Sequence, residues 1–151
     1  MKGNTVDNYE MFNEVLVRLF RDIMNIEQKA IITSEFGDIT NNDMHVMEAI
    51  GIGDVKNMST IAKELSVTVG TLTIAMNSLV KKGYVERIRG KEDRRVVYIS
   101  LSDKGKRAYM HHAQFHKEMI NNMIKGLNDQ ELKILIGTLS RLNDWFRDLQ
   151  D

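Results

Sequence analysis

Residues 58–101 read MSTIAKELSVTVGTLTIAMNSLVKKGYVERIRGKEDRRVVYISL, and the spacing of their apolar side chains changes partway along. Before Gly83 the apolar residues recur every three or four positions, which is the period of an amphipathic helix. After Gly83 the spacing changes toward the two-residue period of a strand. The segment therefore predicts helices followed by a β-hairpin.

Two short helices are predicted before Gly83. The first follows Asn57, and its apolar face comprises Met58, Ile61, Ala62 and Leu65. Residues 66–68 form a turn, and the Thr68 hydroxyl is suited to cap the second helix. The apolar face of that second helix comprises Val69, Leu72, Met76, Leu79 and Val80. Its other face carries short polar residues, which leaves it free to approach a partner.

The hairpin is predicted from residues 84–89 and 96–101. Both runs are rich in β-branched and aromatic residues, and the sequence GKED at 90–93 lies between them as a turn. Two helices joined by a short turn and followed by a charged hairpin form the pattern of a winged helix-turn-helix.

Longer helices are predicted on both sides of this segment. Capping boxes at Thr40/Asp43 and Asn128/Glu131 predict helices over 41–50 and from about 129 onward, and Ser102 caps another that continues to about Gly126. Leucine-rich stripes at helical spacing occupy both ends of the chain: Phe12, Leu16, Leu19, Ile23, Ile26 and Ala30, then Leu132, Leu135, Leu139, Leu142, Phe146 and Leu149.

The fold class predicted is mainly α, a winged helix-turn-helix DNA-binding domain with one β-hairpin wing. We expect a single domain over 1–151, with a DNA-binding lobe at 39–101 and dimerisation helices at 5–38 and 102–151. The two terminal stripes exceed what a compact lobe can cover, which favours a homodimer over packing within one chain.

Charge is distributed unevenly along a chain whose 21 basic and 21 acidic residues cancel. Residues 68–107 carry 10 basic and 4 acidic side chains, a net charge of +6, and the remaining segments sum to −6. A charged patch acts over about 8 to 10 Å at physiological ionic strength. A neutral chain can therefore still present a basic face to DNA phosphates. The alternative is a solvated run of charge.

The second short helix and the hairpin supply the candidate contacts with double-stranded DNA. Threonine and asparagine can hydrogen-bond base edges in the major groove, and an aliphatic side chain can contact a thymine methyl group. Arginine suits the minor groove, where we expect Arg94 or Arg95 to enter while Asp93 holds the guanidinium of the other. Weak surface ion pairs at a solvated turn are the alternative. The candidate DNA-binding residues are Thr68, Gly70, Thr71, Thr73, Ile74, Asn77, Lys81, Arg87, Arg89, Asp93, Arg94 and Arg95.

Three segments, 59–73, 79–87 and 93–102, resemble the MarR (multiple antibiotic resistance regulator) family. The wing pattern of that family, Asp-x-Arg followed by Leu-Thr, is matched by Asp93, Arg95, Leu101 and Ser102, with serine in place of threonine. The resemblance implies a dimeric transcriptional repressor that binds a palindromic operator and is modulated by a ligand.

A narrower resemblance is to the fatty-acid-synthesis repressors of this family in Gram-positive bacteria. It rests on Glu48 and Gly51 near Met44-His45, on residues 67–71, and on the run Phe115-His116-Lys117-x-Met119. It implies that an acyl-carrier protein or an apolar small molecule is the effector. The ligand-binding candidates are Met44, His45, Met47, Phe115 and Met119, although methionines are more often core residues.

Other classes are set aside or kept as alternatives. The chain has no cysteine, and no nucleophile, phosphate loop or paired carboxylate motif, so we expect neither an enzyme nor a cofactor. His112 and His116 stand at i and i+4, but no carboxylate motif completes a metal site, and none is predicted. Because the chain has no long apolar run, we expect it to make no contact with a membrane and to be cytoplasmic. A protein-binding adaptor and a phenolic-compound-responsive efflux regulator remain as alternatives.

Overall fold

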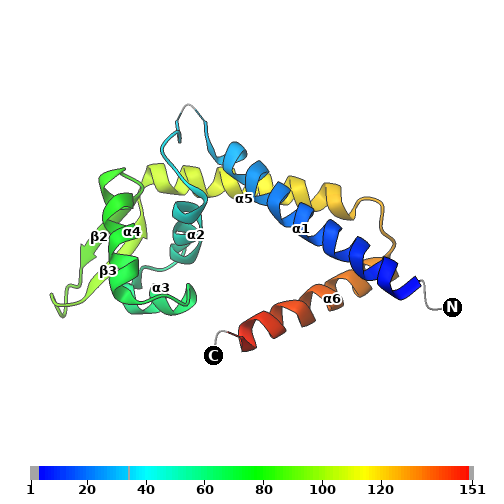
Figure 1. Ribbon diagram of the computed structural model, residues 1–151. Coiled ribbons are helices and arrows are strands. Elements are labelled where there is room, and N and C mark those ends of the chain that lie inside the picture. The colour runs from blue at the N-terminus through cyan, green and yellow to red at the C-terminus, as the bar shows by residue number, and fades with distance from the viewer. Residues whose placement is uncertain (1–3, 34, 150–151) are drawn as a thin grey trace. The chain divides into compact units, whose positions relative to one another are not determined.

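The computed structural model describes residues 4–33 and 35–149, and the side chains from residue 7 onward (Figure 1). The ends of the predicted 1–151 domain, and Ser34 within the predicted segment 5–38, lie outside the described residues. The helices are α1 (Asn4–Ile31), α2 (Asn41–Ile50), α3 (Met58–Glu64), α4 (Val69–Lys81), α5 (Asp103–Ile124) and α6 (Asp129–Asp148). The strands are β1 (Lys56–Asn57), β2 (Val85–Arg89) and β3 (Val97–Leu101).

The chain divides into two compact units within α5. The first unit runs to Ala113 and contains α1 to α4, the sheet and the first half of α5, and the second contains the rest of α5 and α6. The predicted helices and hairpin are present at nearly the predicted bounds, so the mainly helical, winged helix-turn-helix class is confirmed. None of the described helices is long and apolar enough to cross a membrane.

The capping box predicted at the start of α2 is present and is joined to a distant residue. The Thr40 hydroxyl accepts the Asp43 N–H at 3.1 Å, and the Asp43 carboxylate accepts the Thr40 N–H at 3.0 Å. The same carboxylate oxygen accepts the Lys82 ammonium at 2.8 Å, just beyond the end of α4. Because Asp43 is only 5% exposed, this pair fixes α2 against the end of α4.

The turn between α3 and α4 forms as predicted. Asn57 caps α3 through the Thr60 N–H, and Thr68 caps α4 through the Thr71 N–H. Between them Ser66 adopts a left-handed conformation with φ of 53°, which few residues other than glycine adopt readily. The Ile61 and Leu72 side chains are fully buried, so the two helices share one core.

The sheet has three antiparallel strands in the order β1-β3-β2. In the wing, Arg87 of β2 lies opposite Ile99 of β3. Strand β1, with Lys56 opposite Ile99 on the other edge, was not predicted, because a two-residue strand carries no periodic signal. It joins the loop after α2 to the hairpin.

Tyr84 connects four segments of the first unit. Its side chain is fully buried, its N–H donates to the Leu79 carbonyl at 3.0 Å, and its carbonyl accepts the Ser102 N–H at 3.0 Å. Its hydroxyl donates to the Asp38 carboxylate at 2.5 Å, and the Lys104 ammonium lies 4.1 Å from its ring centroid. The end of α4, the start of β2, the start of α5 and the loop before α2 therefore meet at this residue.

The start of α5 passes so close to Tyr84 that only glycine fits. A Cβ at Gly105 would lie 2.1 Å from the Tyr84 carbonyl oxygen and 3.3 Å from the Leu101 Cβ. The Gly105 N–H donates to the Ser102 hydroxyl at 3.1 Å, and that hydroxyl donates to the Gly83 carbonyl at 2.6 Å. Because the obstructing atom is backbone, a larger residue must displace the helix.

We expect Gly105→Ala to lower the free energy of unfolding by about 1–3 kcal/mol, the usual cost of overpacking. Gly70→Ala is the matched control, since its Cβ would meet only the Thr68 hydroxyl at an ordinary 3.8 Å and helical Ala is favoured over Gly. Urea unfolding of both variants measures the difference. Equal stability in the two variants would contradict the close approach.

The hydrogen bond from Tyr84 also predicts a pH dependence. It holds the pKa of Asp38 below its ordinary value, because the hydroxyl stabilises the ionised carboxylate. A carboxylate with a depressed pKa in the folded state adds stability above its unfolded pKa and loses that contribution as pH falls through the folded pKa. The stability difference between the wild type and Tyr84→Phe should therefore shrink as pH falls below about 4.

Urea unfolding of the wild type and Tyr84→Phe between neutral and acid pH measures this difference. Tyr98→Phe in β3 is the control, and its stability relative to the wild type should not change over the same range. A Tyr84→Phe difference that stays constant with pH would rule out the contribution of Asp38.

Candidate nucleic-acid interface

The outward face of α4 carries the predicted major-groove contacts. Ile74 is 75% exposed, and Thr71 and Asn77 are exposed beside it, whereas Leu72 and Met76 on the opposite face are buried. Val69, which the helical spacing predicts on the buried face, is 45% exposed. The exposed predicted residues on or beside α4 are Thr68, Gly70, Thr71, Ile74, Asn77 and Lys81.

The hydroxyl groups at the start of α4 are partly occupied. The Thr68 and Thr71 hydroxyl oxygens lie 2.9 Å apart, and Thr68 also accepts the Thr71 N–H. The half-buried Thr73 donates its hydroxyl to the Val69 carbonyl at 2.7 Å. Thr73 is therefore directed along the helix, and a base would meet it only through its methyl group or the oxygen lone pairs.

A hydrogen bond connects the hairpin with α4. The Arg87 guanidinium of β2 donates to the side-chain carbonyl of Asn77. Two predicted DNA-binding residues from different elements are thus held together, which fixes the wing beside the outward face of α4.

The turn of the wing is held by the backbone. The Asp93 carboxylate accepts the Arg95 N–H at 2.9 Å, which is an Asx-type turn contact. The Val96 N–H also donates to the Asp93 carbonyl at 3.1 Å. A Cβ at Gly90 would lie 2.5 Å from that carbonyl, so glycine is required there. Asp93 thus shapes the turn, both arginine side chains are exposed, and the pairing of one guanidinium with Asp93 stays a prediction.

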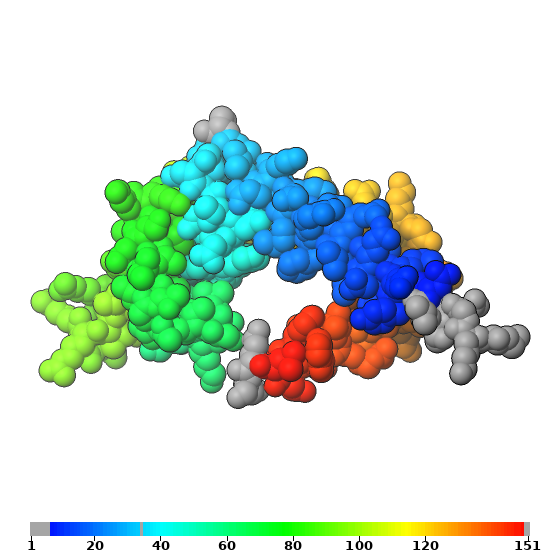
Figure 2. Space-filling view, viewed as in Figure 1, coloured from blue at the N-terminus to red at the C-terminus, as the bar shows by residue number. Residues whose placement is uncertain are grey.

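The hairpin extends from the rest of the winged-helix lobe, as the yellow-green segment of Figure 2 shows. All of residues 91–95 are exposed, and so are Arg87 and Arg89 on β2. The wing therefore displays a group of solvent-accessible basic side chains next to the outward face of α4. This arrangement can neutralise phosphates along one side of a duplex while α4 faces the bases.

The predicted ligand-binding residues do not gather at one described pocket. Met44 and Met47 are buried in the hydrophobic core of the first unit, where a flexible side chain fills irregular space. His45 is exposed and borders a hollow of about 250 Å³ that Thr71 and Leu72 also line. Phe115 and Met119 are half-buried residues of α5 in the second unit.

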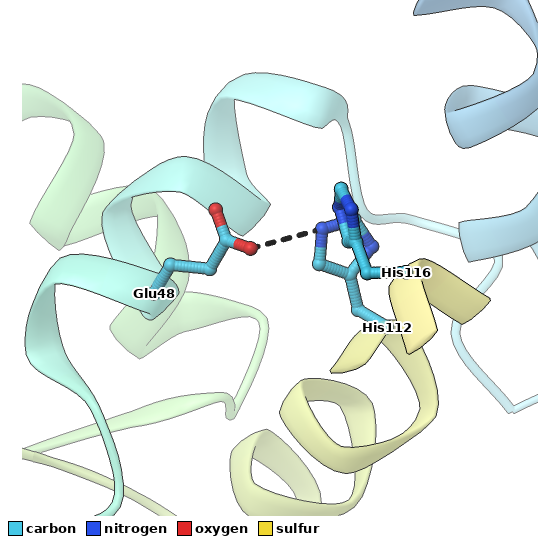
Figure 3. A group of neighbouring side chains, drawn as sticks. All are labelled: Glu48, His112 and His116. Atoms are coloured by element: carbon cyan, nitrogen blue, oxygen red, sulfur yellow. Dashed lines mark ion pairs between the residues drawn. The ribbon is translucent and has the colours of Figure 1, made fainter. Parts of the chain in front are cut away.

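A polar group that the sequence pattern did not indicate lies between α2 and α5. The buried His112 places its Nε2 3.1 Å from one carboxylate oxygen of Glu48, and the exposed His45 places its Nδ1 3.3 Å from the other (the His112 pair is dashed in Figure 3). The hydrogen bond with His112, and then that with His45, lower the pKa of Glu48 below its ordinary value. Since 64 residues separate Glu48 from His112, no local motif could have paired them.

These elements define the class of protein: a winged helix-turn-helix, which is a DNA-binding fold of transcriptional regulators. A family model described as the transcriptional regulator SarA/Rot matches residues 27–111. The chain therefore belongs to the SarA/Rot family of transcriptional regulators, a winged-helix and MarR-like group.

Individual relatives agree with this assignment. The chain is similar to Streptococcus pneumoniae FabT, crystallised in complex with DNA, with 37% identity and a TM-score of 0.86 over 93% of this chain and 99% of that one. It is 28% identical to the uncharacterised HTH-type regulator YpoP of Bacillus subtilis over 95% of this chain and 98% of YpoP. An E. coli MarR mutant bound to operator DNA is 27% identical, with a TM-score of 0.61 over 87% of this chain and 96% of that one.

Proposed function

We propose that the protein is a dimeric repressor that controls genes of fatty-acid synthesis by binding a palindromic operator. An acylated carrier protein regulates this binding. In this proposal α4 of each subunit lies in the major groove and its wing lies along the adjacent minor groove. The observation that carries the proposal is the exposed face of α4 held beside a basic wing by the bond between Asn77 and Arg87.

The groove assignments follow from the side chains on each element. Ile74 is suited to a thymine methyl group, and Thr71 is suited to hydrogen-bond a base edge or a phosphate. The exposed Arg94 and Arg95 are suited to a narrow minor groove, where the negative potential is strongest. Lys81 and Arg89 are suited to phosphates on either side of these contacts.

A homodimer is supported by apolar side chains that the described part of one chain leaves in solvent. In α1, Phe12 is 60% and Phe20 is 70% exposed, and in α6, Ile134 is 62% and Leu139 is 52% exposed. No residue of α6 is buried. Soluble monomers seldom expose so many large apolar residues on single helices, whereas subunit interfaces do.

The fatty-acid branch of the proposal rests on the likeness to FabT, which is 37% identical to this chain. Since carrier proteins are acidic, such a partner would dock on a basic surface and shift the equilibrium between dimer conformations of different DNA affinity. Met44, His45, Met47, Phe115 and Met119 remain the proposed ligand-contacting residues.

The proposal predicts that selection from a random duplex library recovers a sequence with dyad symmetry. Addition of acylated carrier protein should then change the affinity for that duplex, because the effector binds one dimer conformation more tightly. Fluorescence anisotropy of the labelled duplex measures both effects, with the unacylated carrier as control. Salt-sensitive binding without any enriched sequence would indicate an adaptor instead, and an affinity that acylated carrier leaves unchanged would exclude only the fatty-acid effector.

The wing assignment predicts the effect of Arg95→Ala. Operator affinity should fall, and the slope of its logarithm against the logarithm of salt concentration should decrease by about one per subunit, because one phosphate-neutralising contact is lost. Arg21→Ala, which removes an exposed arginine of α1, is the charge-matched control and should leave the slope unchanged. The wing has no part in binding if affinity and slope in Arg95→Ala equal those of the wild type.

A further inference from the structure

We propose that a hollow between the loop after α2 and the edge of β3 is a binding site for a small aliphatic α-amino acid, with L-leucine as its probe. Residues 50–55, residues 99–101 and Lys106 of α5 line this hollow, and all of them belong to the first compact unit. The site goes beyond the proposed function and does not depend on it, because it concerns a free amino acid and not DNA or an acyl group.

The hollow lies where the chain has left α2 and has not yet joined the sheet. Gly51 ends α2 with a φ of 70°, a conformation that favours glycine, and residues 52–55 form the loop that leads to β1. Pairing between β1 and β3 begins at Lys56, which lies opposite Ile99. The edge of β3 at residues 100–101 therefore borders the hollow instead of another strand.

Aliphatic side chains form the apolar part of the hollow. Ile50, Ile99 and Leu101 are buried, with at most 2% exposure, and so are held in place by the core. In the loop, Ile52 is 44% and Val55 is 46% exposed. An aliphatic ligand would cover part of this apolar surface, and the removal of such surface from water favours binding. The lining therefore selects an aliphatic side chain.

The size of the hollow limits the ligand to a small molecule. Its volume is about 240 Å³. An apolar cavity of about 150 Å³ holds benzene, whereas sites for drug-sized ligands measure about 300–1,000 Å³. A free amino acid of the size of leucine lies within these limits.

Two opposite charges border the hollow and match the two charged groups of an amino acid. Asp54 belongs to the loop after the C-terminal end of α2, and Lys106 belongs to the first turn of α5. The end of each helix reinforces the nearby charge, because a helix attracts cations at its C-terminus and anions at its N-terminus. The ammonium of the ligand therefore pairs with Asp54, and its carboxylate pairs with Lys106.

The Lys106 ammonium is available for such a contact. In the described part of the chain it is paired with Asp103 at 3.9 Å, which is long for an ion pair, and the Asp103 side chain is 93% exposed. An exposed pair of this kind contributes little to stability, so its exchange for a ligand carboxylate costs little. Asp54 is exposed as well, so both charges can be reached from solvent.

The test is isothermal titration calorimetry of the full-length protein with L-leucine at neutral pH. We expect one L-leucine per chain, and an affinity lowered about tenfold or more in Asp54→Asn and in Lys106→Met, because each variant loses one hydrogen bond between charged groups. Asp129→Asn and Lys63→Met, which change exposed residues that do not line the hollow, are the matched controls and should bind L-leucine as the wild type does.

Two analogues test the role of each charge. Isocaproate has the same aliphatic chain without the ammonium, and isoamylamine has it without the carboxylate. Each should bind the wild type more weakly than L-leucine does. Asp54→Asn should not weaken the binding of isocaproate, since that analogue has no ammonium to pair with Asp54.

A variant that fills the hollow tests its location. Gly53 lines the hollow, and a Cβ built there would meet no described atom within 4 Å, so Gly53→Val should fold and should weaken the binding of L-leucine. Gly126→Val in the second unit is the control, because a Cβ at Gly126 would also meet no described atom within 4 Å.

Circular dichroism of each variant establishes that it is folded. Three outcomes would overturn the site: failure of the wild type to bind L-leucine, binding of isocaproate as tight as that of L-leucine, or equal affinity in Asp54→Asn, Lys106→Met and the controls. Each of them would leave the DNA-binding proposal untouched.

Discussion

The packing of Tyr84 in the first unit determines how its other elements meet. The fully buried ring lies against Phe36, with centroids 6.5 Å apart, and the backbone on either side ends α4 and begins β2. The start of α5 passes so close to the Tyr84 carbonyl that residue 105 must be glycine. One aromatic side chain with satisfied polar groups thus fixes the direction of the hairpin relative to α4.

The orientation set by Tyr84 has a direct consequence for DNA binding. A reading helix and a wing can contact neighbouring grooves only if their relative position is maintained. Here the bond between Arg87 and Asn77 maintains it at the surface, and Asp93 maintains the shape of the turn through the backbone of Arg95. The arginine side chains at the tip stay in solvent, where they can adjust to the phosphates and the groove.

Two buried polar side chains, Asp43 and His112, lie where segments distant in sequence meet. Asp43 joins the start of α2 to Lys82 after α4, and His112 of α5 meets Glu48 of α2. A buried polar group left without a partner is costly, so each contact penalises structures in which its two helices separate. Helix α2 takes part in both contacts and thereby links the helix-turn-helix to α5.

The helices and strands could be predicted from the amino-acid sequence, because the signals that specify them are local. The capping residues Thr40, Thr68 and Asn128, the periodicity around Leu72 and the hairpin before Leu101 gave the fold class and the outward face of α4. Tertiary structure alone decided the contacts between segments far apart. Three features depend on which backbone atoms and side chains the packing brings together: the Glu48–His112 pair, the role of Asp93 and the strand β1. The spacing of residues along the chain does not indicate these contacts.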